Sequence, residues 1–379
     1  MHKLKVGIDA RLLSRPLSGI GQYTLKMCQA LSKIENISLY LYSPSPIPAD
    51  VVCKLSVENI RTANFNNGVL RQFWTECHLP LWAKKDGVDV FWGPAHRLPR
   101  WLPNSIASAV TIHDLVWKYA GETMRPLSRF LERYQMPAAV SSADHVIAIS
   151  NATAVAVKKE LGIKSDKLSI VLLGANVTEK TVPFRPLEQL DINHPYFLFV
   201  GTLEPRKNLP RLLTAYSYLA NSLKDQAMLV IAGGKGWGGI DINHTVADLG
   251  LEKYVRILGF VDETTLTSLY ANALFLAMPS LYEGFGLPLV EAMAHGTPVL
   301  TSNNSSMPEV AGNAGLLIDP LDTHSIKNGL EELIINHDLR RNLADNSRDN
   351  IARFNWDTAA EQLISVFQKA ISTRANQHS

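Results

Sequence analysis

The residues best placed to do chemistry in this chain lie in one segment, PSLYEGFGLPLVEA, at positions 279–292. Two carboxylates, Glu283 and Glu291, flank the turn Gly284-Phe285-Gly286. A helix should begin at Leu287, because a proline comes next and proline is well tolerated in a first helical turn. N–H groups at a helix start lack partners within the helix and favour a bound anion, while carboxylates accept hydrogen bonds from hydroxyls. The segment suits a ligand with phosphate and sugar groups; the alternative is a helix whose acidic first turn is stabilised by its dipole.

A second segment, FLFVGTLEPRKN at positions 197–208, carries the basic pair Arg206 and Lys207 between an apolar run and a helical pattern. In open α/β sheets, ligands bind at the carboxyl ends of the strands. Cations at the N-terminus of a helix oppose its dipole unless an anion compensates them. We therefore expect the pair to bind a diphosphate, with arginine as a fork and lysine as a point charge. The alternative is a solvated helix start.

Short apolar runs alternate with helical patterns along both halves of the chain, and this alternation predicts parallel, doubly wound sheets. Two domains are also what 379 residues favour. Helices are expected at Gln22–Ile34 and at Ala152–Leu161, the latter capped by Ser150 or Asn151. The proline-rich stretch Thr181–Pro195 reads as the linker. The expected strands are Lys5–Asp9, Ser38–Tyr42, Val88–Trp92, Ser108–Ile112, His145–Ile149, Leu168–Leu172, Tyr196–Val200, Met228–Ala232, Val255–Leu258, Leu274–Ala277, Pro298–Thr301 and Gly315–Ile318.

Together these motifs make the chain resemble the family 4 retaining glycosyltransferases of the GT-B fold. GTLEPRKN is followed by PSLYEGFGLPLVEAMAHGTPV, whose E-x7-E pair is that family's signature, and GIDARLL, SGIGQYT, the element Thr111–Asp114 and RFNWDTAA also fit. The resemblance spans nearly the whole chain and implies two Rossmann-like domains facing a cleft. Residues 1–185 would bind the acceptor and residues 186–356 the nucleotide sugar. Residues 357–379 would form a helix that crosses back to the first domain.

The resemblance also implies catalytic roles. Arg206 and Lys207 would stabilise the departing diphosphate, and Glu283 would face the donor sugar. His113, after a strand end, would contact the donor sugar, although a lone histidine is more often structural. Because retaining members are thought to react on one face of the sugar, with the leaving phosphate helping to deprotonate the acceptor, no protein nucleophile is expected.

Further residues are implied in donor binding. Glu291 would hold the ribose hydroxyls, the backbone at Phe260 and Val261 would meet the base, and the turn from Gly284 to Leu287 would offer N–H groups to the phosphates. Gly19 and Gly21 would let a loop of the first domain approach the phosphates, since glycine permits close backbone approach. A plain turn is the alternative for these two glycines.

Within the family, the motifs most resemble bacterial mannosyltransferases that use GDP-mannose. The implied function is transfer of a hexose to a lipid-linked oligosaccharide in lipopolysaccharide O-antigen or exopolysaccharide synthesis, with no cofactor and no metal, since no D-x-D motif supplies ligands. Three alternatives stay open: a UDP-sugar-dependent transferase of the same fold, a nucleotide-sugar epimerase or hydrolase, and a silent nucleotide-sugar-binding subunit.

Composition and charge bound the cellular setting. Three cysteines without metal-like spacing, no secretory signal and no long apolar run favour a cytoplasmic protein. Residues 1–190 hold 23 Lys/Arg against 15 Asp/Glu and also five of the seven tryptophans. Basic and aromatic residues together suit peripheral binding to the anionic inner face of the membrane. The alternative is that the tryptophans lie mostly in the core and the lysines form a solvated surface. Dinucleotide fingerprints, P-loops and nucleic-acid-binding patterns are not found, so no nucleic-acid partner is expected.

Overall fold

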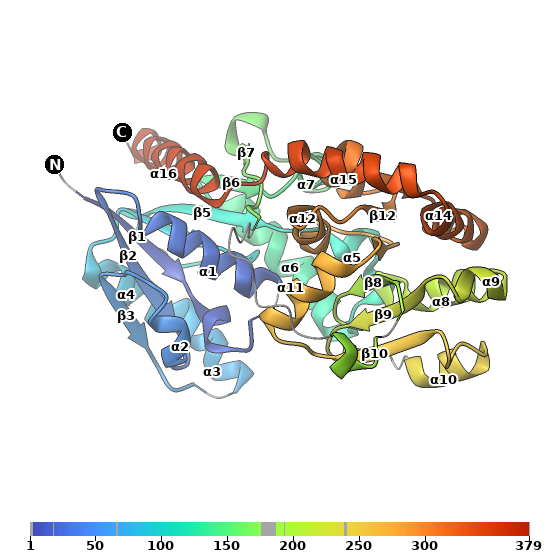
Figure 1. The fold of residues 1–379 in the computed structure, drawn as a ribbon. Helices are drawn as coiled ribbons and strands as arrows, with labels where there is room; N and C mark the ends of the chain where they lie inside the picture. The colour runs from blue at the N-terminus through green and yellow to red at the C-terminus, as the bar shows by residue number, and fades with distance from the viewer. Residues whose placement is uncertain are drawn as a thin grey trace. The chain divides into compact units, whose positions relative to one another are not determined.

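The computed structural model describes residues 3–17, 19–65, 67–175, 187–192, 194–238 and 241–378. The chain forms two compact units, each built on one parallel sheet with helices packed around it (Figure 1). The first unit contains Met1–Leu115, Phe130–Gly174 and Asn355–Ser379, and the second contains Val116–Arg129 and Ala175–Phe354. The predicted fold class, two doubly wound parallel-sheet domains, is confirmed.

The sheet of the first unit has seven strands in the order β3-β2-β1-β4-β5-β6-β7. Six of them match predicted runs, whereas β3 was missed because its sequence, NIRT, is mostly polar and lies at the sheet edge. The strands are β1 (Leu4–Asp9), β2 (Ile37–Ser43), β3 (Asn59–Thr62), β4 (Val90–Gly93), β5 (Ala107–Ile112), β6 (His145–Ala148) and β7 (Leu168–Ile170).

The sheet of the second unit repeats this scheme with six strands in the order β10-β9-β8-β11-β12-β13. All six predicted runs form strands, which are β8 (Tyr196–Val200), β9 (Met228–Ala232), β10 (Val255–Gly259), β11 (Leu276–Met278), β12 (Val299–Ser302) and β13 (Gly315–Ile318). In both sheets the strand order reverses beside the first strand, between β1 and β4 and between β8 and β11. Such a switch point is where open α/β sheets bind ligands, outside the carboxyl ends of the strands.

Helices connect the strands of each sheet. In the first unit α7 begins after Ser150, whose hydroxyl accepts a hydrogen bond from the Thr153 N–H at 3.0 Å. Of the two N-cap candidates, Ser150 and Asn151, Ser150 is therefore the N-cap. The helices are α1 (Gly19–Leu31), α2 (Ala49–Val52), α3 (Gly68–Phe73), α4 (Leu79–Asp86), α5 (Val116–Tyr119), α6 (Pro126–Ser142), α7 (Asn151–Leu161), α8 (Leu209–Ser217), α9 (Asn221–Lys224), α10 (Ile242–Asp248), α11 (Glu263–Asn272), α12 (Leu287–Ala294), α13 (Met307–Ala311), α14 (Thr323–Ile335), α15 (His337–Ile351) and α16 (Trp356–His378).

The units are not continuous in sequence. Helix α16 packs against α1 and β5 of the first unit (Figure 1), and Arg374 Nε donates to Asp144 Oδ2 at 3.0 Å. The domain division expected from the sequence placed the segment Val116–Arg129 in the first domain, residues 1–185. The segment belongs instead to the second unit. Trp237 Nε1 donates to the Thr123 carbonyl at 2.8 Å, which ties the segment there. The predicted boundary at residues 185 and 186 involves positions outside the described residues.

The tryptophans of the basic half divide between core and surface. Trp74 and Trp92 are fully buried, Trp82 and Trp117 are half-buried, and Trp101 is 68% exposed. The core interpretation therefore holds for two of the five, and a tryptophan-rich membrane face is not formed by this set as a whole. Across the described residues, no helix has the length and apolar character needed to cross a membrane.

Candidate active site

The two predicted ligand-binding segments lie on either side of the switch point of the second sheet. Arg206 and Lys207 form the short 3-10 helix Pro205–Lys207 after β8, and Glu283 follows β11. Strands β8 and β11 are neighbours and parallel, so their carboxyl ends and the loops beyond them share one edge of the sheet. The fold thus brings together residues that are 76 positions apart.

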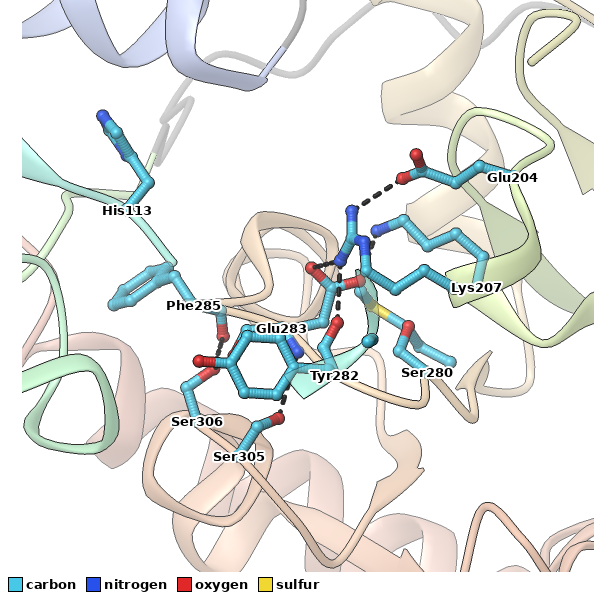
Figure 2. A network of polar contacts seen from close by, with 12 residues as sticks. His113, Glu204, Lys207, Ser280, Tyr282, Glu283, Phe285, Ser305 and Ser306 are labelled. Atoms are coloured by element: carbon cyan, nitrogen blue, oxygen red, sulfur yellow. Dashed lines mark hydrogen bonds and ion pairs between the residues drawn. The ribbon is translucent and has the colours of Figure 1, made fainter. Parts of the chain in front are cut away.

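Four charged side chains form one chain of ion pairs at this edge (Figure 2). Lys207 Nζ donates to Glu283 Oε1 at 2.6 Å, and Arg206 Nη1 lies 2.5 Å from Glu283 Oε2. Arg206 Nη2 donates to Glu204 Oε1 at 2.6 Å, and Nη1 also donates to the Tyr282 carbonyl at 2.8 Å. The anion that compensates the two cations here is therefore supplied by the protein's own carboxylates.

The network is buried, so the basic pair is not a solvated helix start. Lys207 is 7% exposed and Glu283 is 7% exposed. Burial alone would raise the pKa of Glu283, but the positive charges of Arg206 and Lys207 outweigh it and hold the pKa at about 2. Glu283 is thus ionised at neutral pH, and both of its oxygens already accept hydrogen bonds from cations. Two positive and two negative charges leave the cluster with no net charge.

Two members of this site were missed by the sequence reasoning. Glu204 holds Arg206 in place, and Asn208 has a left-handed backbone with φ 61°. The Asn208 side-chain amide donates to the carbonyls of Pro279 at 2.9 Å and Pro320 at 2.8 Å, so it joins three loops of the same sheet edge. Their position in the sequence could have indicated both residues, since each lies within two places of the basic pair in GTLEPRKN.

The predicted turn and helix after Glu283 are both present, with α12 beginning at Leu287. Gly286 has φ 100°, a backbone conformation that residues with a Cβ rarely adopt, so this position favours glycine. The Ser306 hydroxyl shares its hydrogen between the Glu283 carbonyl at 2.9 Å and the Phe285 carbonyl at 3.0 Å (Figure 2). The Phe285 ring is buried against Phe354, which leaves its backbone for any contact with a ligand.

Glu291 lies just over one turn into α12. Its Oε2 accepts a hydrogen bond from the Tyr270 hydroxyl at 2.8 Å, and the ring of His295 stacks on that of Tyr270. Burial and then the nearby Glu291 carboxylate raise the pKa of Tyr270, so this tyrosine stays a hydrogen-bond donor. At the end of β10, Phe260 is 83% exposed and Val261 is half-buried, which leaves the Phe260 ring accessible for stacking.

The remaining predicted site residues belong to the first unit. His113 follows β5 and is buried; its Nε2 lies 2.7 Å from the Pro94 carbonyl and therefore carries the proton. Burial and then His96 lower the pKa of His113 to about 3, so the imidazole is neutral at pH 7 and its Nδ1 can only accept a hydrogen bond. Gly19 and Gly21 lie in the first turn of α1, whereas the sequence placed them in a loop.

No metal-binding cluster is found within the described ranges, where no three His, Cys, Asp or Glu side chains are grouped closely enough to hold an ion. At the second sheet's switch point, Arg206 and Lys207 place positively charged hydrogen-bond donors that a bound anion would share with Glu204 and Glu283. The carboxylates can also accept hydrogen bonds from hydroxyl groups. Donors for a phosphate and acceptors for hydroxyls are the two requirements of a nucleotide-sugar site.

Two glycosyltransferase families match adjacent parts of the sequence. Residues 184–350 match the family described as Glycosyl transferases group 1, and residues 17–179 match Glycosyltransferase Family 4. The matches meet near the division between the two units and together cover most of the chain. The chain therefore belongs to the glycosyltransferases of family 4, with the GT-B fold, and it is an enzyme of the hexosyltransferase class.

Relatives and solved structures agree with this class. The chain is 28% identical over 390 residues to O-antigen chain mannosyltransferase B of Escherichia coli, covering 96% of this chain and all of the relative. It is 26% identical to O-antigen chain mannosyltransferase RfbU of Salmonella typhimurium, covering 86% and 90% of the two chains. Sucrose-phosphate synthase of Thermosynechococcus elongatus superposes with a TM-score of 0.77 at 21% identity, over 98% of this chain and 100% of that one. WaaG, a glycosyltransferase involved in lipopolysaccharide biosynthesis, superposes with a TM-score of 0.74 at 17% identity, over 96% and 99%. The two structures show the fold alone.

Proposed function

We propose that this enzyme transfers mannose from GDP-mannose, with retention of configuration, to a lipid-linked saccharide during bacterial O-antigen or surface polysaccharide synthesis. The observation that carries the proposal is the full-length similarity to an O-antigen mannosyltransferase, with the two carboxylates and the basic pair in place. Glu283 and Lys207 form the centre of the proposed donor site.

The proposed reaction depends on charge. As the bond from the anomeric carbon to the diphosphate breaks, negative charge grows on the leaving group, and cations fixed in a poorly hydrated site stabilise it strongly. Lys207 and Arg206 would share their hydrogen bonds between Glu283 and the diphosphate. Glu283 orients the sugar and does not attack it, and the leaving phosphate accepts the acceptor's proton. Glu291, held by Tyr270, would accept hydrogen bonds from the ribose.

We further propose that transfer needs no metal ion, since Arg206 and Lys207 supply the positive charge that a metal ion would otherwise provide. Activity in excess EDTA tests this point. Transfer at an unchanged rate is expected, whereas a complete loss that Mg²⁺ or Mn²⁺ restores would refute the metal-free reaction.

Peripheral attachment to an anionic membrane is also part of the proposal. The first half of α6 exposes Phe130 at 58% and Tyr134 at 59% of their surfaces. Arg133 is exposed on the same helix. Aromatic and basic side chains together suit the interface of an anionic bilayer.

Thermal shift with GDP, UDP and ADP at matched concentrations tests the donor. A ligand that binds the folded state raises the melting temperature by mass action, and a site shaped for guanine rejects the smaller uracil. GDP should give the largest shift. A larger shift with UDP would refute the GDP-mannose assignment and leave the glycosyltransferase class intact.

A further inference from the structure

The switch point of the first sheet carries a group of arginines that the donor site does not use. Arg11 and Arg15 follow β1, and Arg97 follows β4. Strands β1 and β4 are parallel neighbours, so both loops lie at the same carboxyl edge of the sheet. This place in the first sheet corresponds to that of Arg206 in the second.

Arg11 is held by several contacts, one of which leads to Arg71. Its Nε donates to both oxygens of Asp9, at 2.9 and 2.8 Å, and its guanidinium lies 5.5 Å from the centre of the Trp74 ring. Its Nη2 donates to the Thr75 hydroxyl at 3.0 Å, which in turn donates to the carbonyl of Arg71 at 2.8 Å. Helix α3, which carries Arg71, is therefore tied to the loop after β1.

Positive charge is in excess at this edge. Burial, then Arg71 and Arg11, lower the pKa of Arg15. Burial also lowers the pKa of Arg97, with Arg11 and Arg15 adding to the effect and Glu132 opposing it. Arg15 is thus within electrostatic range of Arg11 and Arg71, and Arg97 is within range of Arg11 and Arg15.

The acidic groups nearby do not balance this charge. Asp9 is engaged by Arg11, and Glu132 lies 3.8 Å from Arg97 while also contacting His96. In the part of the chain that the structure describes, no carboxylate forms an ion pair with Arg15 or Arg71. Like charges held together are costly unless an anion joins them, and guanidinium groups bind phosphate oxygens in pairs.

We propose that Arg15, Arg71 and Arg97 form a second anion site, which binds the phosphate or diphosphate that joins the acceptor saccharide to its lipid. Arg11 ties the loop after β1 to the helix that carries Arg71, through Thr75. The inference rests on the proposed function, since it assigns the site to the acceptor of that reaction. Arg71 contributes through its guanidinium ends, because its Nε already donates to the Phe65 carbonyl at 3.1 Å.

Calorimetric titration with inorganic pyrophosphate tests the site without any need for catalysis. The wild type should show two binding events, one at each switch point. Arg15→Gln/Arg71→Gln should lose one event, and Arg206→Gln should lose the other. Lys158→Gln/Lys164→Gln removes two exposed charges from the first unit without touching the arginine group and should titrate like the wild type. If the Arg15/Arg71 variant titrates like the wild type, the site does not exist. Arg15→Gln alone, at an exposed position, serves as the second variant should the double variant not fold.

Kinetics then identify the source of the phosphate. With a soluble short-prenyl diphosphate saccharide as acceptor, the Arg15/Arg71 variant should raise the acceptor KM at least about tenfold and leave the donor KM unchanged. The same saccharide as an alkyl glycoside without phosphate should show no such rise. A rise in the donor KM alone would overturn the acceptor assignment. The acceptor assignment would also be overturned if the Arg15/Arg71 variant kept its acceptor KM but bound phosphatidylglycerol vesicles more weakly. That result would assign the site to a phospholipid headgroup. Absent transfer with normal pyrophosphate binding would instead count against the proposed function.

Discussion

Lys207 Nζ lies 2.6 Å from Glu283 Oε1, although 76 positions separate the two residues in the chain. Each side chain comes from the loop after one of two neighbouring strands, so this ion pair joins the two sides of the switch point. Both residues are buried, so the loss of either one would leave a buried charge without part of its compensation, in addition to disturbing the proposed donor site.

Replacing Lys207 with methionine should lower both stability and transfer. The buried Glu283 would keep Arg206 as its only cation among the network's described members, and an undercompensated buried charge costs about 2–3 kcal/mol. The free energy of unfolding from urea titration measures this loss. Transfer should fall at least about tenfold in the folded enzyme, since one proposed contact to the leaving group is lost.

The variants Glu283→Gln and Lys207→Met/Glu283→Gln complete the cycle. If the pair is coupled, the double variant should be more stable than the sum of the two single losses predicts. Lys158→Met, at an exposed position of α7, is the matched control and should change neither property. Additive losses would show that the two side chains do not interact.

Stability should depend on Glu283 in acid. Its folded pKa of about 2 is below the unfolded value, so its stabilising effect is present above that unfolded value, near pH 4.5, and is lost as pH falls through about 2. Glu283→Gln should therefore be less stable than the wild type at pH 7 by about 3 kcal/mol. Urea titrations at several pH values should show the difference shrinking below pH 4.5. A difference independent of pH would mean that the pKa of Glu283 is not depressed.

Removing the Tyr270 hydroxyl should weaken donor binding. Tyr270→Phe keeps the buried ring but deletes the hydrogen bond to Glu291, which should raise the donor KM about threefold to tenfold. The turnover number should change little, because in the proposed site the contact orients Glu291 for donor binding and does not touch the reacting atoms. Tyr254→Phe, on the same unit but away from Glu291, is the comparison variant. A fall in turnover with an unchanged donor KM would assign Tyr270 another role.

Liposome binding should be electrostatic and should depend on α6. Binding to phosphatidylglycerol vesicles should weaken as the Debye length falls from ~10 Å at 0.1 M salt to ~3 Å at 1 M. Phe130→Ser/Tyr134→Ser should reduce it further, whereas Val155→Ser, an exposed apolar position on α7, should not. Sedimentation with vesicles measures the salt dependence, the effect of the double variant and that of the control variant. Equal binding to neutral and anionic vesicles would leave the charge asymmetry as an ordinary solvated surface.

Much of the fold was predictable because its local signals were strong. Apolar runs such as Tyr196–Val200 are buried on both faces of a parallel sheet, and the sequence shows this directly. The polar edge strand Asn59–Thr62 gave no such signal. The crossing of Val116–Arg129 into the second unit depends on contacts such as that of Trp237 with Thr123, which join residues far apart in sequence and leave no local pattern.

The sequence indicated which charged residues would lie together at the switch point of the second sheet, but not how they would be paired or buried. Residue types and motif spacing indicated Arg206, Lys207 and Glu283, but not that the three neutralise one another in a buried network. Glu204 was missed because a carboxylate two residues from an arginine has no distinctive spacing. Pairing and burial are tertiary properties, set by how the loops after β8 and β11 meet.

Transfer of label from GDP-[14C]mannose to a lipid-linked acceptor in membrane extract tests the central claim most directly. The wild type should move label into the lipid fraction, UDP-[14C]glucose should give little, and Lys207→Met should reduce the rate at least about tenfold. Without acceptor, GDP-mannose should stay intact. Hydrolysis of the donor without transfer, label only from a UDP-sugar, or wild-type transfer by Lys207→Met would contradict the account.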